Sequence, residues 1–282
     1  MTIAALGTDE SKLFGAEVHR IFTKEDSILK KVCRFRNITG AKSYQFPKIA
    51  AFEAQQRTLG TNIATNNPAS TPVTVTLQEY SAGVYVDKLL DGQVSWHMRE
   101  EMAGLVAGAM KRKLDQIIID AYVAYTGSYT NSYTVPSSGD LTFLAFQEAA
   151  KALDTTGVPD NDRFSIIHAK GFHSVMGETR ASSSDFVSGK STETGKKPNL
   201  YGFDICKMGN NGSLSGLPIN GSDVRTNYFV HKMAMGLIMG SDFSVEVNYI
   251  PEKASYLVAG LFTAGAGLVD ETGVVEVFSD ET

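Results

Sequence analysis

The chain has 282 residues, with 26 lysines and arginines against 31 aspartates and glutamates, and therefore a net charge of −5. This mildly acidic balance argues against broad affinity for nucleic-acid phosphates. The two cysteines, Cys33 and Cys206, lie far apart in the sequence. That spacing argues against a disulfide framework or a zinc cluster, so we expect both to remain thiols in a reducing compartment.

The sequence carries no recognisable targeting or membrane-spanning segment. Residues 1–11 lack the basic start and the apolar core of a signal peptide. The most apolar late stretch, 256–269, is short and contains several glycines and threonines, so it is not expected to span a bilayer. We therefore expect a soluble protein that is made in a cytoplasm.

The first part of the chain predicts a helical arm, two strands and a long polar loop between them. Apolar residues at helical spacing predict short helices over 12–22 and 27–32. Alternation predicts strands over 44–49 and 73–86, and a slip of phase in the second strand suggests a bulge or a bend. Residues 51–72 are nearly empty of large apolar side chains, which points to function or to disorder. We interpret them as a polar hairpin arm that reaches onto a neighbouring chain.

Residues 94–125 predict one long helix, about 45 Å in length, around which the rest of the chain is organised. Its apolar stripe consists of Met98, Met102, Leu105, Val106, Ala109, Met110, Leu114, Ile117, Ile118, Ala121, Tyr122 and Tyr125. Charged residues such as Asp115 fall mostly off this stripe, where we expect them to be hydrated. Taken alone, the pattern fits a long core helix at least as well as any special role.

The remaining sequence alternates between helices and strands and ends in strands. We expect a turn region over 128–139, helices over 141–153 and 170–178, and strands over 164–167, 202–208, 227–239, 243–250, 255–262 and 273–278. The stretch 227–239 holds either one long strand or two. Polar or glycine-rich loops are expected over 180–199 and 209–223.

Motifs for phosphate binding and for a nucleophile each fail at a required position. The glycine-rich segment 209–216 lacks the Lys-Ser/Thr pair and is not followed by an amphipathic helix. Residues 189–191 read Gly-Lys-Ser, as at the end of a P-loop, but Ser184 stands where that motif requires glycine. Leu214, rather than serine, is the central residue of 212–216, so there is no nucleophile elbow.

Metal motifs fail in the same way. His168 and His173 are five residues apart, which places them on different faces of a helix, so we interpret them as a strand-end and a helix-surface histidine. Residues 160–162 begin like a calcium loop, but Arg163 follows where more oxygen ligands are needed, and a turn leading into a strand explains them better. We therefore predict no enzyme activity and no catalytic, cofactor-binding or metal-binding residues.

The order of these parts is more informative than any single motif. It runs from a helical arm through a polar hairpin and a long helix to an α/β region and closing strands. The stretches that fit best are GAEVHRIF at 15–22, the segment 80–125, RFSIIH at 163–168 with 170–175, and YGFDI at 201–205. In this order of parts, the chain resembles the major capsid proteins of tailed bacteriophages, with the Hong Kong 97-like fold.

The resemblance implies an α+β fold with a defined division of the chain. We expect an N-terminal arm at 1–39, an extended β-hairpin loop at 40–85 and a peripheral domain with the spine helix at 86–140. An axial domain is expected at 141–240, and closing strands of the peripheral domain at 241–282.

The resemblance also implies an architectural function. Subunits would form hexamers and pentamers that close an icosahedral shell around double-stranded phage DNA, enclosed without sequence-specific binding. Scaffold and portal proteins would be partners, no membrane or cofactor would be involved, and the virion would be assembled in the cytoplasm of the host bacterium. Glu53, Gln56 and Arg57 on the hairpin arm are the expected inter-subunit contacts.

Two alternatives remain open from the sequence. A cellular nanocompartment shell of the encapsulin type shares the same fold and would carry enzyme cargo instead of DNA. An α/β enzyme is the alternative from a different class, and it would need a pocket with converging titratable groups, of which the sequence offers no recognisable set.

Overall fold

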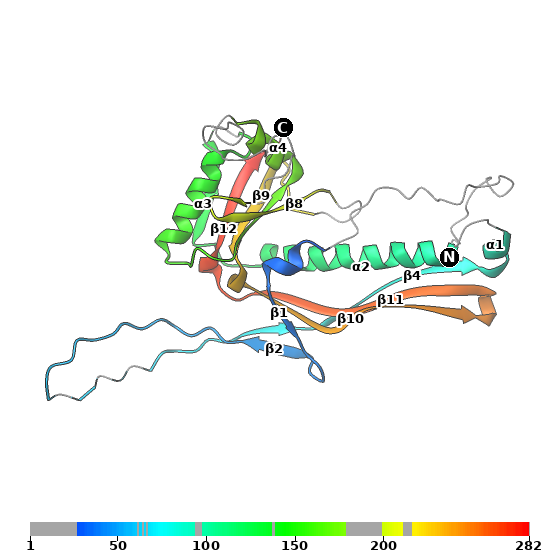
Figure 1. Ribbon diagram of the computed structural model, residues 1–282, viewed down its shortest axis with the longest axis horizontal. Helices are drawn as coiled ribbons and strands as arrows, with labels where there is room; N and C mark the ends of the chain where they lie inside the picture. The colour runs from blue at the N-terminus through cyan, green and yellow to red at the C-terminus, as the bar shows by residue number, and fades with distance from the viewer. Residues whose placement is uncertain are drawn as a thin grey trace.

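The computed structural model describes residues 27–281, except for 61, 64, 66, 94–97, 137–138, 179–198 and 211–215. The fold consists of a long platform, a dome at one end of it and a hairpin that extends away from both (Figure 1). The helix expected over 12–22 lies outside the described residues.

The platform is a four-stranded sheet in the order β1-β10-β11-β4. Its strands are β1 (Arg34–Asn37), β4 (Gln78–Asp87), β10 (Met235–Ile250) and β11 (Ser255–Leu268). The first pair, β1 and β10, is parallel, and the other pairs are antiparallel. The strand expected over 73–86 divides at Leu77 into β3 (Val73–Thr76) and β4. The slip of phase therefore marks the point where the chain leaves the hairpin and enters the platform.

The dome is built on a six-stranded sheet in the order β5-β12-β9-β6-β8-β7. Its strands are β5 (Asn131–Thr134), β6 (Arg163–His168), β7 (Asn199–Leu200), β8 (Phe203–Met208), β9 (Val224–His231) and β12 (Val274–Asp280), and α3 (Phe143–Thr155) and α4 (Ala169–Gly177) accompany it. The stretch 227–239 belongs to two strands, because the 3₁₀ helix η3 (Lys232–Ala234) separates β9 from β10.

One expectation about the dome was wrong, and one strand of its sheet pairs with partners that the sequence did not indicate. The turn region expected over 128–139 contains β5, a short strand at the edge of the sheet that pairs in parallel with β12. The last strand was expected to close the peripheral domain beside the long helix, but β12 pairs with β9 and β5 in the dome sheet. Both pairings join segments far apart in the sequence, which local patterns do not encode.

The long helix is α2 (Met98–Val123), which lies along the platform (Figure 1) and is preceded by an unexpected short helix, α1 (Lys88–Gln93). In its first half only one face is buried, and Leu105, expected in the apolar stripe, is 38% exposed. Every residue from 114 to 119 is buried, because this part packs between the platform and the dome in one continuous core. Among the described helices, none is both long enough and apolar enough to cross a membrane.

The expectation that Asp115 is hydrated was wrong, since its side chain is fully buried. Its Oδ1 atom accepts hydrogen bonds from the Ser27 hydroxyl at 2.7 Å and from the Leu29 amide at 3.1 Å. Its Oδ2 atom accepts from the Ile28 amide at 3.2 Å. These donors form the start of the 3₁₀ helix η1 (Leu29–Val32). Asp115 therefore caps η1 from a distant helix, which satisfies amides that would otherwise be buried without partners.

The structure agrees with the expectation that the two cysteines form no disulfide. Cys33 is a free thiol, and both Cys33 and Cys206 are buried. Burial, reinforced by the Asp115 carboxylate, raises the pKa of the Cys33 thiol. The thiolate, which is the reactive form, is therefore suppressed.

We predict that Asp115→Ala lowers the free energy of unfolding by about 2–4 kcal/mol, because it leaves the buried Leu29 amide, the half-buried Ile28 amide and the Ser27 hydroxyl without their acceptor. Urea unfolding of the unassembled subunit measures the change. Glu100→Ala on the exposed surface of the same helix is the matched control, with an expected change within about 0.5 kcal/mol. Equal stability of the two variants would contradict the capping role.

Candidate assembly surfaces

The residues considered for metal chemistry are separate and have structural partners. No group of three or more His, Cys, Asp or Glu side chains in the described ranges is arranged to hold a metal ion. His168 ends β6 and caps α4, while His173 is exposed on α4 beside the ring of Phe172. These positions confirm the interpretation of the two histidines.

The acidic turn before β6 is also structural. Arg163 is buried, and its guanidinium contacts Asp154 at 2.8 Å and Asp160 at 3.0 Å. Asp162 has a positive φ of 56°, as expected in a tight turn. The turn therefore leads into the strand as expected. The motif residues at 184, 189–191 and 214 lie outside the described part of the chain.

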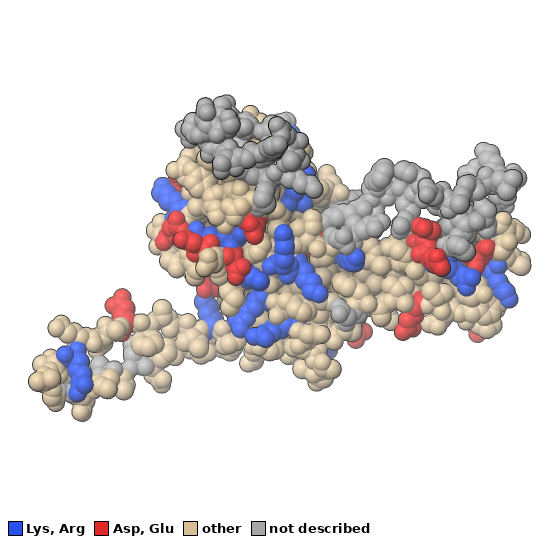
Figure 2. All heavy atoms as spheres, viewed as in Figure 1, with Lys and Arg blue, Asp and Glu red and all other residues tan. Residues whose placement is uncertain are grey.

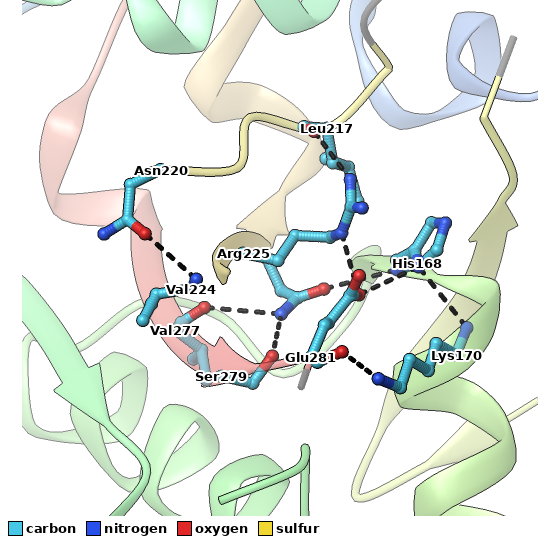
Figure 3. A network of polar contacts seen from close by, with 10 residues as sticks. His168, Lys170, Leu217, Asn220, Val224, Arg225, Val277, Ser279 and Glu281 are labelled. Carbon is cyan, nitrogen blue, oxygen red and sulfur yellow. Dashed lines mark hydrogen bonds and ion pairs between the residues drawn. The ribbon is translucent and has the colours of Figure 1, made fainter. Parts of the chain in front are cut away.

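A polar network at the top of the dome holds Glu281, the last residue that the structure describes (Figure 3). The Glu281 carboxylate lies 2.7 Å from Nε of Arg225 and 2.8 Å from Nδ1 of His168. The Lys170 ammonium donates to the Glu281 carbonyl oxygen. Burial and the Arg225 guanidinium lower the pKa of His168 by more than Glu281 raises it. The imidazole is therefore neutral at pH 7, and the network is a structural anchor rather than a reactive site.

The outer part of the hairpin arm, beyond β2 and β3, contributes no residue to the core clusters of the described chain. Beyond β2 (Ser43–Phe46) and β3, its two sides are joined by an Ile49–Ser70 bridge and by hydrogen bonds from Ala50 N to Ala69 O and from Thr71 N to Lys48 O, each 2.9 Å. It then extends as a long open loop away from the platform and the dome (Figure 1).

The arm exposes apolar as well as polar side chains. Ile49, Phe52, Leu59 and Ile63 are 65%, 63%, 100% and 73% exposed. Glu53, Gln56 and Arg57, the contacts expected from the sequence, are also exposed on this arm. Sequence reasoning underrated the four apolar residues because they are scattered through a polar segment. Their spacings of three, seven and four residues would fit one face of a helix, but the described residues of this segment form no helix. Their exposure is what marks them as a group.

Glycines on the platform allow the hairpin to cross it closely. A Cβ at Gly236 would lie 2.5 Å from the Phe46 ring, and one at Gly267 would lie 2.7 Å from Val75 Cγ2. At Gly265 it would overlap the carbonyl oxygen of Thr76. The first two glycines are direct partners across β10 and β11. We call these three glycines the glycine seat, because they leave room on the sheet for the Phe46 ring, the Val75 side chain and the Thr76 carbonyl of the hairpin.

An ion-pair cluster fixes the hairpin next to this seat. The Lys48 ammonium lies 3.0 Å from Asp270 Oδ1 and 3.1 Å from Glu271 Oε2. Burial opposes the charged form of Lys48, but the hydrogen bonds to both carboxylates raise its pKa overall. Burial likewise opposes the Asp270 carboxylate, whose pKa is nevertheless lowered by hydrogen bonds from Lys48 and Thr272. Lys48 and Asp270 are therefore charged at pH 7. The cluster joins the base of the arm to the β11–β12 connection.

Comparison with known proteins gives these surfaces a context. The family model described as "Phage capsid protein" matches residues 7–281. The capsid structure of the cyanophage P-SCSP1u is 18% identical, with a TM-score of 0.76 over 96% of this chain and 93% of that chain. The capsid of the Helicobacter pylori bacteriophage KHP30 is 9% identical, with a TM-score of 0.78 over 95% of this chain and 94% of that chain. Curated protein sequences gave no match.

At these identities the structural neighbours establish the fold, and their capsid architecture is consistent with the expected Hong Kong 97-like fold. The family match extends over almost the whole chain and does not favour the cellular nanocompartment. It indicates a structural protein of the virion rather than an enzyme. The chain therefore belongs to the phage capsid protein family and is a major capsid protein that self-assembles into the shell.

Proposed function

We propose that this chain builds an icosahedral shell of hexamers and pentamers around double-stranded DNA. Scaffold and portal proteins would take part in assembly, which would occur in the host bacterial cytoplasm. The observation that carries the mode of assembly is the hairpin arm, which exposes four large apolar residues and has no core of its own. An arm of this kind gains stability only when a neighbouring subunit covers it.

We propose the division of the chain into an arm, an extended loop, a peripheral domain and an axial domain. The dome sheet with α3 and α4 would be the axial domain, and the platform with α2 the peripheral one. The two sheets support this division because each has its own strand order. With β12 in the dome sheet, the closing strands at 241–282 would be shared between the two domains.

In the proposed contact, the apolar side chains of the arm provide most of the free energy of binding. The polar side chains align the arm on the adjacent subunit. Burying one large apolar side chain contributes about 1.5–3 kcal/mol before the cost of ordering the loop. Glu53, Gln56 and Arg57 would contact polar groups of the adjacent subunit. Exposed charged pairs contribute little to affinity, so their role would be alignment.

We predict that replacing residues 55–67 by a short Gly-Ser turn leaves the subunit folded but prevents closed shells. The segment lies outside the core clusters, so the free energy of unfolding should change by less than about 1 kcal/mol. Sedimentation and electron microscopy, with the parent protein in parallel, measure assembly. Intact shells from the deletion variant would refute the role of the arm.

A triple substitution tests the contribution of the apolar side chains to assembly without changing the length of the arm. We predict that Phe52→Ser with Leu59→Ser and Ile63→Ser raises the protein concentration needed for assembly at least tenfold, because each lost burial removes more than 1 kcal/mol. Leu144→Ser with Ile219→Ser changes two exposed apolar residues of the dome, which are 45% and 46% exposed, and serves as the control. A similar shift in both variants would mean that surface apolarity in general, and not the arm, drives assembly.

A substitution in the glycine seat tests whether assembly needs the close crossing of the hairpin over the platform. We predict that Gly265→Ala forces the hairpin off the platform, lowers the free energy of unfolding by about 1–3 kcal/mol and reduces the yield of closed shells. Gly83→Ala, in β4 of the same sheet, is the matched control, since its Cβ would lie at an ordinary 3.5 Å from Leu257 Cδ1. Light scattering during assembly, with urea unfolding of both subunits, separates the two effects. Normal shells from Gly265→Ala would show that the close crossing is dispensable.

A further inference from the structure

The start of the described chain carries basic side chains and no acidic ones. Between residues 27 and 52 the sequence contains no aspartate or glutamate, although the whole chain has a net charge of −5. The same segment contains the cations Lys30, Lys31, Arg34, Arg36, Lys42 and Lys48. The overall acidity of the protein therefore hides a local basic region.

The fold brings most of these cations to one place and adds another from a distant part of the sequence. Lys30 and Lys31 lie on η1, and Arg34 and Arg36 lie on β1. Together with Lys232 of η3, the two lysines of η1 line an open hollow of about 700 Å³. Figure 2 shows lysines and arginines gathered over η1 and β1, at the foot of the dome. We call Lys30, Lys31, Arg34, Arg36 and Lys232 the basic surface.

Three cations of the basic surface lie beside aromatic rings. Lys30 lies 4.6 Å from the Phe35 ring, Arg34 lies 5.6 Å from the Phe46 ring, and Lys31 lies 6.0 Å from the Phe164 ring. None of the five cations makes an ion pair with a carboxylate of the described residues. Aromatic faces orient cations but carry no net charge, so the positive potential remains available to a polyanion.

The residue composition of the basic surface indicates whether its partner is a protein or a nucleic acid. The buried centre of a protein–protein interface is apolar and depleted in lysine, whereas surfaces that bind nucleic acid are polar and strongly positive. Phe35, which is 38% exposed, is the one large apolar side chain of the hollow's rim that solvent reaches extensively. The basic surface therefore has the composition expected for contact with phosphates, not for contact with a second subunit.

We propose that the basic surface faces the lumen of the shell and contacts the phosphate backbone of the packaged DNA. This inference rests on the proposed enclosure of DNA by the shell. The contacts are to phosphates only, so they carry no sequence preference. Each neutralised phosphate releases condensed counterions, which makes the contact dependent on salt. The five cations also offset part of the repulsion between the subunit's net negative charge and the DNA.

Lysine footprinting of assembled particles tests the proposal. DNA-filled particles and emptied shells are treated with a small acetylating reagent, and mass spectrometry measures modification at Lys30, Lys31 and Lys232. We expect modification at these lysines to be several-fold slower in filled particles than in emptied shells. Lys88 and Lys207, exposed on α1 and β8, are the controls, with a ratio near one.

Each other outcome overturns the inference. Slow modification in both kinds of particle would mean that protein, such as a neighbouring subunit, covers the basic surface. Fast modification in both would mean that the surface does not touch DNA. Equal protection of Lys88 and Lys207 would show general exclusion of the reagent. Failure of the chain to form particles at all would refute the proposed function instead, and is seen before any labelling.

A charge variant provides a second readout. Lys31→Gln with Arg36→Gln removes two exposed cations of the basic surface, and Lys88→Gln with Lys207→Gln removes two exposed cations elsewhere. Both variants change the net charge by the same amount. We expect the first to lower the temperature at which heated particles release DNA to a fluorescent dye by several degrees, and the second to leave it unchanged. Equal release temperatures for the two variants would contradict the inference.

Discussion

The burial of α2 between two sheets is the constraint on which the rest of the structure depends. Its first half packs on the platform with one face, and residues 114–119 of its second half are buried on all sides where the dome meets the platform. Val258 of the platform, Ile118 of the helix and Tyr228 of the dome belong to one core cluster. The two sheets are therefore joined through a shared apolar core, and α2 sets the distance between them.

Because residues 114–119 of α2 are buried on all sides, the polar side chains of Asp115 and Gln116 need hydrogen-bond partners inside the protein. Asp115 caps η1, and the adjacent Gln116 accepts a hydrogen bond from the amide of Gly216 at 3.1 Å. Two neighbouring polar side chains thus tie the start of the described chain and a loop of the dome to the same turn of the helix. Buried carboxylates are costly unless hydrogen-bonded, so this turn is stable only when both segments are in place.

Sequence patterns predicted the elements whose periodicity reflects burial. Strand β6 and helices α3 and α4 were recognised in this way, and the main part of α2 was as well. The patterns missed Asp115, because a charged residue in a helix is normally hydrated, and β5, because an edge strand of Asn, Ser, Tyr and Thr resembles a turn. They located β12 but gave no partner for it, since strand partners are chosen by long-range packing. On the arm, the sequence identified the segment without a core, but not its four exposed apolar residues.

The glycine seat has a mechanical consequence. The hairpin extends from the seat by about 14 residues on each side, which corresponds to about 40 Å of extended chain. Over that length, a tilt of about 5° at the base displaces the tip by about 3–4 Å, more than a hydrogen bond tolerates. The hairpin is therefore a lever whose pivot is the contact of Phe46, Val75 and the Thr76 carbonyl with the three glycines of the seat. Small changes at the glycine seat, where no side chain fills the space, are therefore amplified along the hairpin toward its tip.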